Sequence, residues 1–152
     1  MYDNKFFYTG KNLTEQELRS FEQKFNIVMP KNIKEYYLTY NGGLPEKDLF
    51  KQNEKCTFFV NYFLPIMSPD GLSVEKVLFL LNDEKTFPSW LIPFANDESG
   101  NFFCYSLRKQ DNGAIYYYNH EFEYGESPED HITFLTDSVL KFINGLQAGD
   151  IN

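Results

Sequence analysis

Residues 91–119 read LIPFANDESGNFFCYSLRKQDNGAIYYYN, and this stretch decides the fold class. It holds three segments typical of strands, Leu91–Asn96, Asn101–Leu107 and Ala114–Asn119, which are apolar, aromatic or β-branched. Turn-forming residues at 96–100 and 110–113 separate them, and Asn112-Gly113 offers two positions tolerant of positive φ, which favours a tight hairpin. We therefore expect a meander of three antiparallel strands.

Two helices are predicted before the meander. Thr14 to Glu17 has the form of a capping box, and Leu18, Phe21 and Phe25 follow at helical spacing. Pro30 suits the first turn of a second helix because its missing N–H is not needed there. Asn41-Gly42-Gly43 would end that helix, since Asn and Gly accept the left-handed geometry of a C-cap.

The remaining elements complete an α+β pattern. Thr57–Leu64 is predicted to be one strand, and Ser73 would cap a helix over Val74–Leu81. A final amphipathic helix that stops near Asn144-Gly145 is predicted from the apolar residues Leu135, Val139, Phe142, Ile143 and Leu146. We expect a single domain over residues 1–152, with helices packed against a mainly antiparallel sheet.

The charge of the chain is unevenly distributed. Fourteen Lys and Arg against 22 Asp and Glu give 14 − 22 = −8. Residues 1–76 hold ten basic and ten acidic side chains, whereas residues 77–152 hold four basic and twelve acidic ones. A net −8 argues against a general nucleic-acid binder, because it gives no attraction toward phosphates. It fits either a basic partner or a need for solubility, and composition alone leaves both open.

Five of these acids lie in residues 120–131, which we expect to form an exposed acidic loop; they are Glu121, Glu123, Glu126, Glu129 and Asp130. Tyr116-Tyr117-Tyr118 comes directly before it, and aromatic anchors beside carboxylates are typical of a surface that binds a basic partner. A solvated loop with no partner explains the same residues. The secondary candidates for such an interface are Asp97, Glu98, Asp111, Tyr116 and Tyr118.

No recognisable catalytic, phosphate-binding or metal-binding motif is present in the sequence. Cys56, Cys104, His120 and His131 lack the close spacing of zinc ligands, so we expect no metal and no cofactor. We read the two cysteines as buried free thiols and the two histidines as loop residues. Asp97 and Glu98 fit either turn chemistry or an acid/base pair, and we expect the turn.

Targeting and membrane signals are also missing from the sequence. The N-terminal residues lack a charged-then-apolar signal pattern, and the longest strongly apolar run, Val77–Leu81, is far shorter than a membrane span. We therefore expect a cytoplasmic protein that contacts neither membrane nor nucleic acid directly.

Taken together, these segments resemble the SUKH superfamily of Smi/Knr-like domains. In the first half the resemblance rests on the helix Thr14–Phe25, Ile27-Val28-Met29-Pro30, the aromatic helix from Ile33, and Tyr40-Asn41-Gly42-Gly43. In the second half it rests on Ile92–Asp97, Gly100-Asn101, the strands Phe103–Leu107 and Ile115–Asn119, and Phe142 in the last helix. Met29 stands where Leu is usual. Asn101 stands where Asp is common, which weakens any claim that this position binds a basic group.

The resemblance implies a binding protein without enzymatic activity. Bacterial members look like immunity proteins that block a cognate toxin domain, often a nuclease, and an acidic surface suits such a basic partner. Fungal members look like scaffolds with long disordered arms, which we do not find in this sequence. The immunity role is therefore the expectation, and an intracellular scaffold or regulator is the alternative. A small hydrolase using Asp97, Glu98 or His120 is a third hypothesis.

A structural role is expected for one set of residues because of the backbone conformations that they favour, namely Pro30, Asn41, Gly42, Gly43 and Gly100. The resemblance cannot supply interface positions, because interfaces of such inhibitors diversify with the toxin. The exposed tyrosines would equally suit a homodimer, so monomer and homodimer both stay open.

Overall fold

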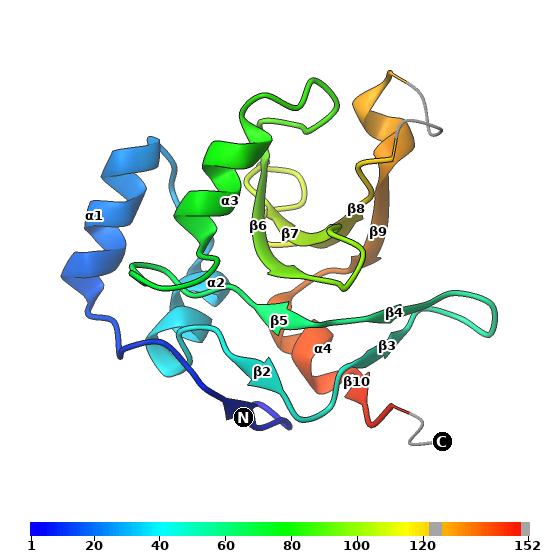
Figure 1. Ribbon diagram of the computed structural model, residues 1–152, viewed down its shortest axis with the longest axis horizontal. Coiled ribbons are helices and arrows are strands. Elements are labelled where there is room, and N and C mark those ends of the chain that lie inside the picture. The colour runs from blue at the N-terminus through cyan, green and yellow to red at the C-terminus, as the bar shows by residue number, and fades with distance from the viewer. Residues whose placement is uncertain (122–125, 150–152) are drawn as a thin grey trace.

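The predicted meander lies at the centre of a five-stranded antiparallel sheet in the computed structural model, which describes residues 1–121 and 126–149 (Figure 1). The strand order is β5-β6-β7-β8-β9. The strands are β5 (Tyr62–Phe63), β6 (Leu91–Asn96), β7 (Phe102–Ser106), β8 (Ile115–Tyr118) and β9 (Ile132–Thr136). The fold is therefore α+β, as the sequence predicted.

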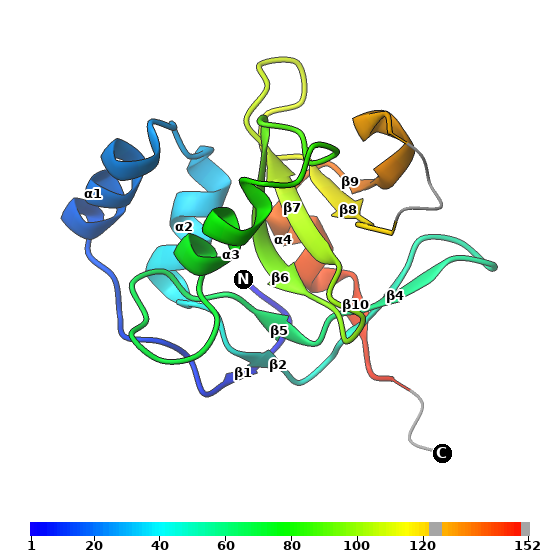
Figure 2. The ribbon, with the colours of Figure 1, turned by 45° about the horizontal axis from the view of Figure 1, so that its top comes forward.

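Two smaller antiparallel sheets lie beside the large one (Figure 2). One pairs β1 (Phe6–Phe7) with β2 (Leu44–Pro45). The other has the order β10-β3-β4, with β3 (Leu49–Lys51) between β10 (Leu146–Gln147) and β4 (Thr57–Phe59). Strands β1, β2, β3 and β10 were not predicted, because strands of two or three residues are too short to show an alternating pattern.

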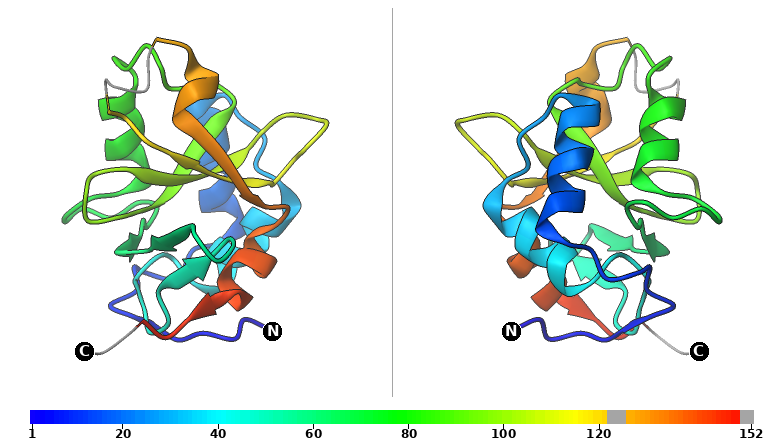
Figure 3. Two further views of the ribbon diagram at one scale, coloured as in Figure 1. Left: turned by 90° about the vertical axis from the view of Figure 1, so that its right-hand side faces the viewer. Right: turned by 90° about the vertical axis from the view of Figure 1, so that its left-hand side faces the viewer.

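Four α-helices pack around these sheets: α1 (Glu15–Phe25), α2 (Lys31–Thr39), α3 (Val74–Leu81) and α4 (Val139–Asn144). Helix α3 packs beside β6, and α4 lies between the five-stranded and the three-stranded sheet (Figure 3). A short 3-10 helix over Pro128–His131 precedes β9. The helices thus cover the sheet from different sides rather than forming a separate layer.

Phe142 on α4 joins the two main sheets in one aromatic core. Its fully buried ring lies 5.0 Å from Phe50 on β3 and 5.4 Å from Phe103 on β7, measured between ring centroids. Phe63 on β5 and Phe94 on β6 lie 6.3 and 5.8 Å away. Aromatic rings bury large apolar areas, so this cluster fixes how β3 and β4 sit relative to the sheet.

The predicted helix starts are confirmed at Thr14 and Ser73, whereas the second helix differs at both ends. Thr14 and Glu17 form the reciprocal capping box, and the Ser73 hydroxyl accepts a hydrogen bond from Lys76 N. Pro30 is the N-cap of α2 rather than a residue of its first turn, and Tyr40, in an extended conformation, is the C-cap. The Asn-Gly-Gly segment therefore does not cap α2.

Asn41 and Gly42 instead attach the end of α2 to the segment after β5. The buried Asn41 side chain accepts a hydrogen bond from Ile66 N at 2.7 Å and donates to the carbonyls of Ile66 and Lys11. Gly42 has φ of 73°, and an added Cβ would lie 2.6 Å from the Phe63 carbonyl oxygen. Gly43 pairs with Phe63 as an isolated bridge. These contacts explain the structural role of the Asn41-Gly42-Gly43 motif.

The single strand predicted over Thr57–Leu64 is wrong, because the chain changes sheets within it. Thr57–Phe59 pairs with β3, whereas Tyr62–Phe63 pairs with β6. Between them, Val60 N donates to Asp48 O, and Asn61 N donates to Asn96 O. A β-rich run predicts strand conformation, but its pairing partners are set by packing with distant segments.

Two further predictions need correction. Leu135 lies in β9 and not in the last helix, which begins only after the Ser138 N-cap. The 110–113 turn is not a hairpin with two residues of positive φ, since only Gly113, at 85°, has one. The connection spans residues 107–114 and is closed by the Ser106 and Ala114 backbones.

Candidate functional site: an acidic cleft beside strand β4

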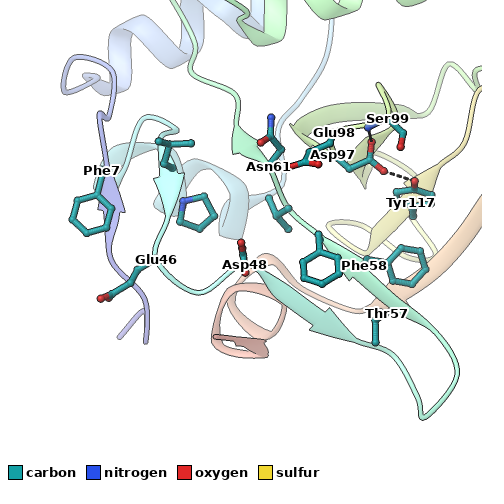
Figure 4. Close-up of a pocket in the computed structure, with 14 residues that line it drawn as sticks. Phe7, Glu46, Asp48, Thr57, Phe58, Asn61, Asp97, Glu98, Ser99 and Tyr117 are labelled. Atoms are coloured by element: carbon teal, nitrogen blue, oxygen red, sulfur yellow. Dashed lines mark hydrogen bonds between the residues drawn. The ribbon is translucent and has the colours of Figure 1, made fainter. Parts of the chain in front are cut away.

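A cleft of about 910 Å³ lies beside β4 (Figure 4). The β1–β2 pair forms one wall, and the segment 57–61 and the turn 97–99 form the others, together with Tyr117 of β8. Phe7 and Phe59 are about half exposed here, at 48% and 53%. The cleft is therefore lined by aromatic rings that water reaches.

Four carboxylates line this cleft, namely those of Glu46, Asp48, Asp97 and Glu98. Within the described residues no Lys, Arg or His lines it, and none of the four carboxylates takes part in an ion pair. Within the described residues, no direct ion pair thus neutralises the carboxylates of the cleft. A cleft with one sign of charge and low-dielectric walls concentrates its field, and here it attracts cations.

Asp97 holds the wall of the cleft in shape. Its Oδ1 accepts hydrogen bonds from the backbone N–H groups of Ser99 and Asn101, both at 2.9 Å. Its Oδ2 accepts one from the Tyr117 hydroxyl at 2.5 Å. Burial, followed by this bond to a carboxylate, raises the pKa of Tyr117, so the phenol stays protonated and donates. The expected turn role of Asp97 is therefore observed, and Gly100 adds the positive φ of 83°.

Asn101 joins this turn to the start of the acidic segment. The buried side chain donates to the Tyr117 hydroxyl at 2.9 Å and accepts from His120 N at 3.1 Å. His120 Nδ1 lies 2.6 Å from the same oxygen. Asn101 is thus a buried residue that links the turn to His120. Glu121, the first acid of the acidic segment, directly follows His120.

The acidic segment is exposed where the structure describes it. Glu121, Glu126, Glu129 and Asp130 are exposed, and Glu123 falls outside the described residues. The Ser127 hydroxyl donates to Glu129, which lowers the pKa of that carboxyl. The loop does not extend to His131 as expected, because His131 is buried and stacks on Tyr118. An exposed acidic surface thus begins next to the cleft.

Asp111 and Tyr116 lie at the other end of the strands. Successive loops of a meander alternate ends, so the 107–114 loop and the 97–99 turn lie at opposite ends of β7. Asp111 accepts hydrogen bonds from Arg108, Ser106 and Tyr116, and the Arg108 guanidinium lies 3.5 Å above the Trp90 ring centroid. The Asp111 charge is therefore paired within the protein.

Tyr118 does not form the exposed anchor that we expected. Its side chain is fully buried, and its hydroxyl lies 2.7 Å from Thr86 Oγ1. The alternation of side chains along a strand places Tyr116 and Tyr118 on one face. The Phe87 ring covers this face at Tyr118, so that Tyr118 is buried. Of the three tyrosines, Tyr117 is the one that lines the cleft.

The cysteines differ from each other. Both are free; Cys104 is buried as expected, whereas Cys56 is exposed in the loop before β4.

Among the residues that the structure describes, no three His, Cys, Asp or Glu side chains gather as a metal site would require. In the same residues, no helix has the length and apolarity to cross a membrane.

Half of the carboxylates in the cleft were not predicted from the sequence. Asp97 and Glu98 were candidates, whereas Glu46, Asp48 and the two exposed phenylalanines were not. Those residues belong to short strands and their connections, and they reach the 97–99 turn only through tertiary folding. The available signal was weak: an acid on each side of Lys47 after the Leu44-Pro45 pair.

An α+β domain with a charged, aromatic cleft and internally bonded turn residues fits a class of small binding modules. The chain belongs to the SMI1/KNR4 family (SUKH-1), whose model matches residues 12–145. No curated protein matches the chain. Domains of this family are generally protein-binding, immunity-type modules, and the fold and cleft of this chain are consistent with a protein-binding role.

Proposed function

We propose that this protein is an immunity-type inhibitor of a cognate nuclease toxin. Its acidic cleft binds the basic domain of the toxin and keeps that domain from its nucleic-acid substrate. The supporting observation is the cleft itself, in which four carboxylates without an ion pair surround half-exposed aromatic rings. Nuclease domains present basic surface to nucleic acid, and such a surface matches this cleft in charge. On this proposal the protein acts by stoichiometric binding and performs no catalysis.

Continuity of charge supports the proposal further. The turn 97–101 is hydrogen bonded to His120, so the exposed acids from Glu121 onward extend the acidic surface of the cleft. We assign the cleft the contact role, because its aromatic rings supply area that can be desolvated. The segment 121–130 has the role of steering, since exposed charges at a rim act mainly on the association rate.

Two double variants with the same charge change test this division. Glu46→Lys with Glu98→Lys alters the cleft, and Glu121→Lys with Glu126→Lys alters the acidic segment. Each takes the net charge from −8 to −8 + 4 = −4. None of these four side chains accepts a side-chain hydrogen bond or forms an ion pair among the described residues, so both variants should fold.

The measurement is binding to the C-terminal domain of the toxin encoded by the adjacent gene, together with survival of cells that express that domain. We expect 1:1 co-purification and rescue by the unaltered protein. The cleft variant should weaken the equilibrium affinity by roughly 100-fold and abolish rescue, whereas the segment variant should slow association by roughly tenfold or less. Equal effects of the two variants would contradict the assignment, and tight binding without rescue would favour a scaffold role.

A further inference from the structure

The strand that lines the cleft has an unpaired edge. In the sheet order β10-β3-β4, strand β4 (Thr57–Phe59) lies at the end, and it pairs only with β3 among the described residues. No other described residue bonds to the backbone of Thr57, Phe58 or Phe59. Because the groups of a strand point alternately to its two sides, part of the β4 backbone is left with unpaired donors and acceptors.

Strand β4 lies between the two groups of carboxylates. Five consecutive residues, 57–61, line the cleft. Glu46 and Asp48 flank them on the side of β2 and β3, and Asp97 and Glu98 flank them on the side of the β6–β7 turn (Figure 4). The unpaired backbone and the uncompensated charge therefore belong to one surface, although they are independent features of it.

The exposed side chains of β4 add a third feature. Thr57 and Phe59 are exposed, whereas Phe58 is half-buried against Tyr117, with ring centroids 4.8 Å apart. Phe58 thus anchors β4 to the large sheet, and Phe59 stays free for a partner. A strand held rigidly on one face, with an open edge, is preorganised to receive another strand.

We infer that the toxin enters this cleft as an extended segment bearing Lys or Arg, which pairs through its backbone with the edge of β4. This inference rests on the proposed function and names the form of the partner. In an extended segment alternate side chains point to opposite faces, so apolar residues can contact Phe59 while basic ones reach the carboxylates. Backbone pairing supplies affinity that is independent of sequence, and the carboxylates select basic segments.

The test uses ¹⁵N-labelled protein and a short blocked peptide of alternating Lys and Val, titrated to millimolar concentration. We expect amide shifts concentrated at Thr57–Asn61 and Asp97–Ser99. The cleft variant Glu46→Lys with Glu98→Lys should lower the affinity by roughly tenfold or more, and an alternating Glu and Val peptide should not bind. The Glu121→Lys with Glu126→Lys variant is the matched control and should bind the peptide nearly as well as the unaltered protein.

Two N-methylated forms of the peptide examine the backbone pairing. One carries the methyl groups on the Lys residues and the other on the Val residues, so that N–H groups on opposite edges of the extended peptide are removed. One form should lose roughly tenfold in affinity, and the other should bind as the parent does. The inference is overturned if both forms behave alike, or if the parent peptide causes no shifts in the cleft.

The outcome can be separated from that of the proposed function. A toxin complex that forms and rescues cells, while the peptide fails in these ways, would overturn the extended segment and leave the inhibitor role intact. Peptide binding at the β4 edge without any toxin binding would support a cleft that binds extended segments and would contradict the inhibitor role.

Discussion

At the scale of single residues, Asp111 shows how a surface loop is held by one carboxylate. Burial raises the pKa of Asp111, but hydrogen bonds from Arg108, Ser106 and Tyr116 outweigh that effect and lower the pKa to about 2 from the usual 3.8. The folded state therefore binds the proton less readily than the unfolded chain does. The resulting stabilisation is complete above the unfolded pKa and is lost as the pH falls toward 2.

Replacing Asp111 with Asn should lower the free energy of unfolding by about 1–2 kcal/mol at pH 7, because three donors lose a charged acceptor. The difference from the unaltered protein should shrink as the pH falls from 4 to 2. Urea unfolding at several pH values, followed by the fluorescence of Trp90, measures both quantities.

The exposed pair of Asp137 and Lys141 provides the control for Asp111. Its atoms lie 3.1 Å apart with both side chains about two-thirds exposed. An exposed pair at this helical spacing contributes about 0.3–0.5 kcal/mol, so Asp137→Asn should have a much smaller effect. A loss for Asp111→Asn that is no larger, or that persists unchanged at pH 2, would contradict the role given to Asp111.

At the scale of elements, the junction between α2 and β5 depends on a close approach of two backbones at Gly42. Gly42 and Gly71 have nearly the same φ, 73° and 69°, so an alanine at either position meets similar left-handed strain. They differ in surroundings. A Cβ at Gly42 would lie 2.6 Å from Phe63 O and 2.7 Å from Pro65 N, whereas one at Gly71 meets nothing within 4 Å.

Gly71→Ala should therefore cost about 1 kcal/mol of unfolding free energy, and Gly42→Ala about 3 kcal/mol or more. The difference between the two measures the steric part alone, because the backbone strain is shared. Thermal and urea unfolding of both variants give the values. Equal losses would mean that the chain relaxes around Gly42 and that the junction is not tightly fixed.

At the scale of the whole molecule, the net charge of −8 arises within residues 77–152, where Asp97 and Glu98 of the cleft and the five acids of the acidic segment make up seven of the twelve acids. Charges on one surface add their fields at distances near the Debye length, which is about 10 Å at 0.1 M salt. We therefore predict that the association rate with the toxin domain falls roughly tenfold or more between 50 and 500 mM NaCl, as stopped-flow measurements would show.

The two charge-reversal variants should both flatten this salt dependence, because each removes the same amount of charge from the steering surface. Only the cleft variant should also speed dissociation, since it changes groups in the contact area. A rate of association that does not respond to salt would argue against electrostatic steering by this face.

Local sequence patterns determined the parts of this protein that depend on near neighbours. The capping box at Thr14, the Ser73 cap and the strands around the 97–101 turn follow from contacts a few residues apart, and they were predicted correctly. The joint order of these segments was also enough to suggest the family, which the match over residues 12–145 confirms.

Tertiary structure alone decided the pairing of the short strands and therefore the candidate site. The run Thr57–Leu64 has one local preference but two partners, and the burial of Tyr118 depends on Phe87, which lies 31 positions earlier. The cleft joins residues from 7 to 117. Local sequence patterns predict the secondary structure of each segment. The site depends on which distant segments bury their apolar faces together, and only the packing of the whole core determines that.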